Sequence, residues 1–157
     1  RSVRFDNAEG KSLLDLIKAR KVPTETNPRR SEDPKGTGDV VLAYATGTSI
    51  SAVWNGDVKN TPPAFCTGDT ESGCGRYLLV TKLTEPLDGL EFYPQRNDAL
   101  IISTGGNVYA IELDQRPIQN FQPIYTGKGK TLFMAVPQSR GIFILATSTL
   151  LGIELPE

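Results

Sequence analysis

Short apolar, β-rich runs alternate along this chain with turn residues, at a spacing of about 8–12 positions that is typical of a sandwich, barrel or propeller. One other segment, SLLDLIKAR (12–20), fits a short helix with Ser12 as its N-cap or a strand, and the strand is favoured because the segment is short for a helix. The pattern therefore predicts strands throughout and at most one short helix. The expected strands are DVVLAYAT (39–46), SISAVW (49–54), RYLLVTKL (76–83), LEFYP (90–94), DALIIST (98–104), NVYAIEL (107–113), FQPIYTG (121–127), TLFMAVP (131–137), GIFILAT (141–147) and LLGIEL (150–155).

An internal repeat discriminates among these β architectures. Residues 98–114 align with 141–157 as a strand, a tight turn and a second strand, and 39–57 follow the same pattern. With LEFYP before it and FQPIYTG after it, the middle copy becomes a four-stranded unit of roughly forty residues, which is the period of a propeller blade. We therefore expect an all-β fold of propeller-type four-stranded blades, either a partial propeller or a fragment of one, with LEFYP innermost and FQPIYTG outermost in the unit.

Composition and charge narrow the class of partner. The chain has 157 residues, of which 38% are hydrophobic, so it is long enough for one domain with its own core. The 17 basic and 18 acidic side chains leave a net charge of −1, which gives no reason to expect binding to nucleic acid. No apolar run reaches the about 18 residues of a membrane span, so no span is expected in this chain.

Several stretches resemble a known family. They are SISAVWNGDVKNTPPAFC (49–66), EFYPQRNDALIISTGGNVYAIELDQRPIQNFQPIYTGKG (91–129) and the closing hairpin. Over about residues 39–157 the chain resembles the C-terminal propeller-like region of PEGA-domain envelope proteins of candidate-phyla (patescibacterial) bacteria. The resemblance implies an extracytoplasmic, membrane-anchored parent protein with a propeller and small β-sandwich modules, and it implies no reaction.

The repeat also predicts what happens at the two ends of the chain. The last copy lacks a fourth strand, and residues 2–7 and 12–19 resemble a third and a fourth strand without a first and second, so the chain is expected to be incomplete at both ends. Because an unpaired edge is a site of aggregation, Leu150–Leu155 should pair with a segment outside 90–149, either the N-terminal part of this chain or a strand of its parent. Stacked blades further predict a core that includes Ile101, Ile102, Ile111, Leu113, Ile144 and Ile153.

The expected domain organisation places a partial blade and a proline-rich, charged linker in 1–38, and blades with a Cys-clipped insertion at 55–75 in 39–157. Cys66 and Cys74 are the two cysteines of the chain and flank a polar, turn-rich loop. A disulfide is favoured, two free thiols are the alternative, and a metal site is less well supported because the chain has no histidine and only two thiols.

The same lack of histidine removes the common catalytic triads and the usual general base, so no catalytic residue, cofactor or metal is assigned. The remaining enzymatic option is a carboxylate pair, for example Asp57 with Asp69 and Glu71. The stretch Gly129-Lys130-Thr131 is similar to the end of a phosphate-binding loop, but it is not followed by the helix that such a loop requires. The long insertion is instead a candidate recognition loop, which an interaction module would place at a blade edge with its aromatic rings exposed. Its candidate contact residues are Trp54, Asn55, Asp57, Asn60 and Phe65.

These observations favour a non-catalytic extracytoplasmic propeller segment that serves as a structural or protein- or glycan-binding module of a larger envelope protein. Its expected partners are the remainder of the parent propeller and an unidentified protein or glycan. The alternative is a propeller-type hydrolase based on carboxylates, with its active site in a missing part of the parent.

Overall fold

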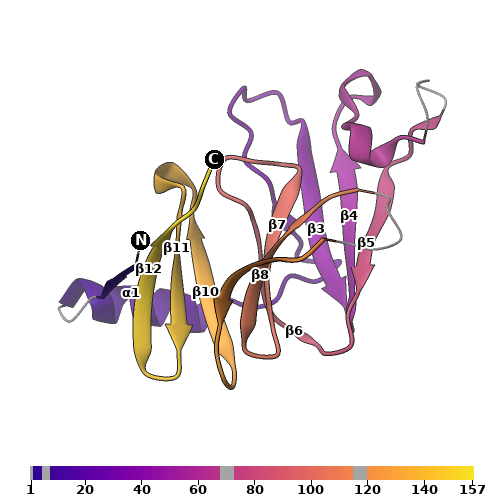
Figure 1. The fold of residues 1–157 in the computed structure, drawn as a ribbon. Helices are drawn as coiled ribbons and strands as arrows, with labels where there is room; N and C mark the ends of the chain where they lie inside the picture. The colour runs from indigo at the N-terminus through magenta and orange to yellow at the C-terminus, as the bar shows by residue number, and fades with distance from the viewer. Residues whose placement is uncertain (1, 5–7, 68–72, 115–119) are drawn as a thin grey trace.

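Antiparallel strands dominate the fold and form three four-stranded sheets that stand side by side (Figure 1). The computed structural model describes residues 2–4, 8–67, 73–114 and 120–157. The strand order is β2-β3-β4-β5 in the first sheet, β6-β7-β8-β9 in the second and β1-β12-β11-β10 in the third. The predicted all-β class is confirmed. The strands are β1 Ser2–Arg4, β2 Arg29–Arg30, β3 Val40–Thr46, β4 Ser49–Asn55, β5 Tyr77–Lys82, β6 Leu87–Phe92, β7 Ala99–Thr104, β8 Asn107–Glu112, β9 Gln122–Thr126, β10 Thr131–Val136, β11 Gly141–Ala146 and β12 Thr149–Glu154.

The three sheets share one hairpin register, as the internal repeat predicts. Each sheet contains a central hairpin whose two strands are joined by a two-residue turn. Positions at the same distance from the turn are equivalent in the three sheets. One cross-strand pair therefore recurs in all three. The recurring pair is Leu42 with Val53, Leu100 with Ile111, and Ile142 with Ile153.

The third sheet is completed by the N-terminal strand. β1 pairs antiparallel with β12, with Ser2 opposite Ile153 and Arg4 opposite Leu151. The prediction that Leu150–Leu155 pairs with a segment outside 90–149 is therefore confirmed, and the partner is the N-terminal part of this chain. The expected role of residues 2–4 is wrong, because β1 is the fourth strand of the last sheet and not the third strand of a partial blade, while residues 5–7 lie outside the described residues.

The segment expected to be a strand at 12–19 is part of helix α1, Ala8–Ala19, so the favoured strand interpretation is wrong and the helix alternative is confirmed. Ile17 lies four positions after Leu13 and three after Leu14, and the three side chains pack as one stripe against the outer face of the third sheet, where Leu145 and Leu150 complete the cluster. The helix forms there because that face would otherwise expose apolar side chains. Short 3-10 helices also lie at Val58–Asn60, Pro63–Phe65 and Pro137–Ser139.

The core lies in the interfaces between these layers. One apolar cluster joins the first and second sheets, a second joins the second and third sheets, and the third lies under α1. Close approach of the third sheet to the second depends on Gly89, where an added Cβ would lie 2.9 Å from the Phe133 ring. Of the six predicted core residues, Ile153 is only partly buried and the other five are buried.

A charged cluster ties the N-terminal segment to the middle of the molecule. Glu91 on β6 is buried and pairs with Arg20, just beyond α1, and with Arg29 on β2, whose Nε lies 3.1 Å from Glu91 Oε2. Arg29 also donates to the carbonyl oxygens of Leu90 and Lys21. Burial lowers the pKa of Arg29, and the neighbouring Glu91 carboxylate opposes that shift. The cluster therefore holds the connection between α1 and β2 against the second sheet.

Candidate functional site: a cleft between the second and third sheets

The insertion between β4 and β5 contains the disulfide that the sequence predicts. Cys66 and Cys74 are joined, and no other form of these cysteines is present. The bond closes an arm in which the Thr67 amide donates to the Gly73 carbonyl at 2.7 Å and the Gly75 amide donates to the Phe65 carbonyl at 2.8 Å. The disulfide thus fixes the chain directly after Phe65.

Loss of this bond should destabilise the protein moderately. Replacing both Cys66 and Cys74 with serine removes a nine-residue ring, and loop entropy predicts a loss of about 2.6 kcal/mol in the free energy of unfolding. Amide hydrogen exchange should accelerate within 55–67 and 73–75 and stay slow in β7, β8 and β11. Equal acceleration in both regions would show that the ring supports the whole fold. Intact wild-type protein should not react with a thiol-specific alkylating agent unless it is first reduced.

The two aromatic residues of the candidate recognition loop are not at the surface. Trp54 and Phe65 are 3% and 2% exposed and belong to the apolar cluster between the first and second sheets. The Trp54 indole N–H donates to the Asp57 carbonyl at 3.1 Å. The expectation of exposed aromatic rings at this loop is therefore wrong, because both rings fill the interface between two sheets.

The polar residues of the same loop remain exposed. Asp39, just before β3, accepts hydrogen bonds from the Asp57 amide and the Asn60 side chain, each at 2.8 Å, and these bonds lower the pKa of the Asp39 carboxyl. Asn55 is the last residue of β4 and lies opposite Val40. A contact role for these side chains stays a prediction. Of the proposed carboxylate pair, Asp57 is in the described structure, whereas Asp69 and Glu71 lie outside the described residues.

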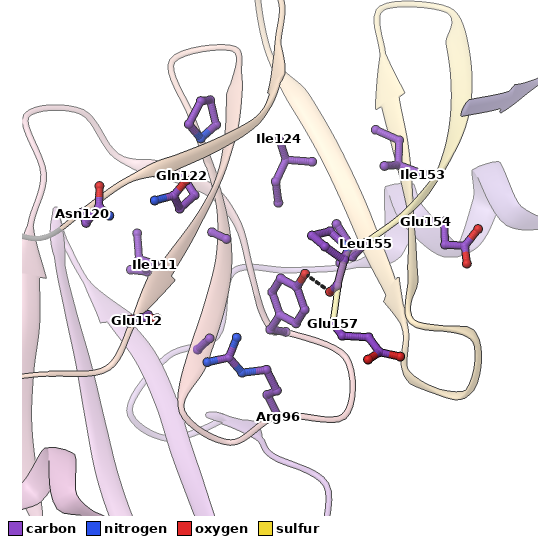
Figure 2. A pocket seen from close by; sticks show the side chains of 15 residues that line it. Arg96, Ile111, Glu112, Asn120, Gln122, Ile124, Ile153, Glu154, Leu155 and Glu157 are labelled. Carbon is purple, nitrogen blue, oxygen red and sulfur yellow. Dashed lines mark hydrogen bonds between the residues drawn. The ribbon is translucent and has the colours of Figure 1, made fainter. Parts of the chain in front are cut away.

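A cleft of about 400 Å³ lies between the second and third sheets, in a region outside the candidate binding loop predicted from the sequence. Figure 2 shows Ile111, Gln122 and Ile124 on one side of it and Ile153 and Leu155 on the other. The floor is aliphatic, with Ala99 and Ala110 contributing only methyl groups. Polar side chains of Arg96, Glu112, Asn120 and Gln122 stand at its margin. A volume of this size is within the range of ligand pockets, about 300–1,000 Å³.

One wall of the cleft is held by the last residues of the chain. Tyr93 donates its hydroxyl to the Pro156 carbonyl at 2.6 Å, and the Leu155 amide donates to the Arg140 carbonyl at 2.9 Å. Burial raises the pKa of Tyr93, so this hydroxyl stays a donor at neutral pH. The wall is therefore a hydrogen-bonded part of the fold and not a loose end.

The arginine at the margin is already engaged. Arg96 lies over the Tyr93 ring, 5.5 Å from its centroid, and its Nε donates to Asp98 Oδ1 at 2.7 Å. The hydrogen bond with Asp98 raises the pKa of Arg96 and lowers that of Asp98. Arg96 is therefore already paired, and the aliphatic floor of the cleft suits an apolar group.

The repeat explains why this cleft is open. Trp54 lies opposite Val41 in the first sheet, and the equivalent pair in the second sheet is Glu112 opposite Ala99. Trp54 fills the space between the first and second sheets, whereas Glu112 is exposed and leaves the corresponding space between the second and third sheets open. The signal was present in the sequence, as a glutamate at the repeat position that holds tryptophan in the first copy.

Comparison with protein-family models, curated proteins and solved structures finds no match to this chain. Among the residues that the structure describes, no three or more acidic or cysteine side chains gather where they could hold a metal ion. In the same ranges, no helix combines the length and hydropathy needed to cross a bilayer.

Proposed function

We propose that this chain is a β-propeller segment that acts as a structural or binding module of a larger extracytoplasmic envelope protein and has no catalytic role of its own. The four-stranded sheets support this proposal, because neighbouring strands in each sheet are consecutive in the chain. The exception is β1, which completes the third sheet beside β12. The adjacency of β6 to both β2 and β10 also supports the proposal, because the innermost strands of blades surround one axis. The disulfide is compatible with an oxidising compartment.

The observation that carries the proposal is the outer face of the first sheet. Leu42 and Val53 are half-buried there, although their equivalents Leu100 and Ile111 are 0% and 1% exposed because the first sheet covers them. On β5, which is the edge strand of the same sheet, Tyr77 and Leu79 are 59% and 52% exposed. Register places all four side chains on one face, since Tyr77 lies opposite Val53 and Leu79 lies opposite Ser51.

Among the residues that the structure describes, no second layer covers this face of the repeat. The second sheet is covered on both faces by its neighbours, and the third is covered by the second sheet and by α1. An apolar sheet face of this kind is typical of a surface that packs against another layer. A further sheet of the same repeat would cover it in the way that the first sheet covers the second.

The uncovered face predicts self-association of the isolated chain. We expect wild-type protein to associate reversibly with rising concentration in sedimentation velocity, and the double substitution Tyr77→Lys and Leu79→Lys to weaken this association about tenfold or more, since like charges would then face each other. Leu16→Lys, at an exposed apolar residue of α1 on the opposite end of the stack, is the matched control and should have no effect. A wild-type chain that stays monomeric and binds no apolar dye would argue against the proposal.

A further inference from the structure

We propose that the cleft between the second and third sheets binds an aromatic side chain presented on a loop of a partner protein. This inference names the ligand of the binding module proposed above and rests on that proposal. It is independent of the outer face of the first sheet, because the cleft lies on the far side of the second sheet.

The first reason is the comparison between two equivalent spaces in one molecule. Between the first and second sheets, Trp54 supplies a large ring at the strand end, opposite Val41. Between the second and third sheets, the equivalent strand end carries Glu112 opposite Ala99, and the cleft occupies the space that a ring would fill. The same backbone frame thus carries an aromatic ring at this strand position in one place and a carboxylate in the other, where the Tyr93 ring leaves the cleft unfilled.

The second reason is that a side chain from a loop helps to fill the space between the first and second sheets. Phe65 reaches the interface from outside the sheet, on the short 3-10 turn Pro63–Phe65 of the disulfide-closed insertion. Its ring is buried in the same cluster as Trp54. A loop that carries an aromatic ring is therefore the form of occupant that this fold already accepts between its sheets.

The chemistry of the cleft agrees with such an occupant. Aliphatic side chains of Ile124, Ile153 and Leu155 line it, and these are suitable contacts for the face of a ring. Exposed amide side chains of Asn120 and Gln122 stand at the margin, where they can hydrogen-bond to the backbone of a bound loop. The margin also lies along β9, the edge strand of the second sheet, so a loop can approach from solvent.

The test uses a peptide with the sequence of the loop that fills the first space. Acetylated and amidated TPPAF is titrated into the nitrogen-15-labelled chain and compared with TPPAA and with N-acetylphenylalanine amide. We expect TPPAF to shift the backbone amide signals of Ala99, Ala110 and Ile124 and to bind about tenfold more tightly than TPPAA, since the ring is the buried anchor. The free amino-acid amide should bind more weakly than TPPAF.

The test also uses a protein variant in which a side chain of the chain itself fills the cleft. Glu112→Trp places in the second sheet the side chain that the first sheet has at the equivalent position, and we expect it to weaken TPPAF binding at least tenfold. Glu25→Trp, at an exposed turn residue away from the cleft, is the matched control and should bind as wild type does. If the Glu112→Trp chain does not fold, the comparison of TPPAF with TPPAA on wild-type protein tests the inference by itself.

Equal shifts with TPPAF and TPPAA, or no shifts with either, would overturn the inference. Equal binding of TPPAF and N-acetylphenylalanine amide would overturn the assignment to a loop and point to a free aromatic molecule. Undiminished binding to folded Glu112→Trp protein would place the ligand elsewhere. Each of these results leaves the association test of the outer face untouched, so failure here is distinguishable from failure of the proposed function.

Discussion

Ile111→Asp should unfold the protein. Ile111 is 1% exposed near the end of β8, where it lies opposite Leu100 in the cluster between the first and second sheets. A carboxylate at this position would be buried without a partner, at a cost of about 5 kcal/mol or more, which is comparable to the whole stability of a domain of about 5–15 kcal/mol. Circular dichroism should show loss of the strand spectrum and of the cooperative thermal transition.

Two further variants make this result specific to burial. Ile111→Val should cost only about 0.5–1.5 kcal/mol, because it removes one methylene group from the same site. Gln122→Asp introduces the same charge at an exposed position of the neighbouring strand and should leave the melting curve close to wild type. A cooperative, near wild-type melt of Ile111→Asp would mean that this interface is not part of the core.

The second large effect is expected at Glu91. Glu91→Ala leaves the half-buried Arg29 guanidinium without its carboxylate and should lower the free energy of unfolding by about 2–3 kcal/mol, somewhat less than the loss at a fully buried pair because Arg20 is partly exposed. Urea denaturation measures this change. Asp98→Asn breaks the exposed pair with Arg96 and should cost less than about 1 kcal/mol. Similar losses in the two variants would show that the Glu91 cluster contributes no more than a surface ion pair.

The repeated hairpins were predictable because their information is local and periodic. Strands 39–46, 98–104 and 141–147 each carry apolar residues on two faces, and each is followed by a short turn and a second strand, so register follows from the turn. The missing fourth strand of the last copy then required a partner, and β1 supplies it.

The helix was not predictable with the same certainty, because its sequence is short and compatible with either structure. SLLDLIKAR offers an apolar stripe only when Leu13, Leu14 and Ile17 are considered at helical spacing, and the surface that selects the helix is the outer face of a sheet formed by residues 131–154. The helix also begins at Ala8, before the expected N-cap at Ser12. Tertiary packing decided between two local options of similar propensity.

Strand β2 gave no sequence signal at all. Arg29 and Arg30 are charged residues close to prolines and show no apolar alternation. They pair with Leu42 and Ala43 because the edge of β3 is free to accept them and because Glu91, distant in the sequence, neutralises Arg29. Such a strand depends on long-range contacts that a window of neighbouring residues does not contain.

The burial of the aromatic residues in the candidate binding loop could not be predicted from the sequence either. Tryptophan and phenylalanine in a long insertion suit a recognition surface, but Trp54 and Phe65 are buried because the interface between the first and second sheets needs volume at that point. The cleft was visible only as a difference between repeats, with Glu112 in the position of Trp54. The sequence signal of the cleft therefore lies in the difference between equivalent positions of the repeat and not in the type of any single residue.

The pairing of β1 with β12 also sets the order of folding. The other strand pairs of the described residues join segments close in sequence, whereas β1 and β12 are separated by about 150 residues. Closing so long a loop costs more entropy than closing a hairpin, so this pair should form after the local hairpins have condensed. During synthesis, β1 must therefore stay unpaired until its partner emerges, and β12 must find it before another edge does.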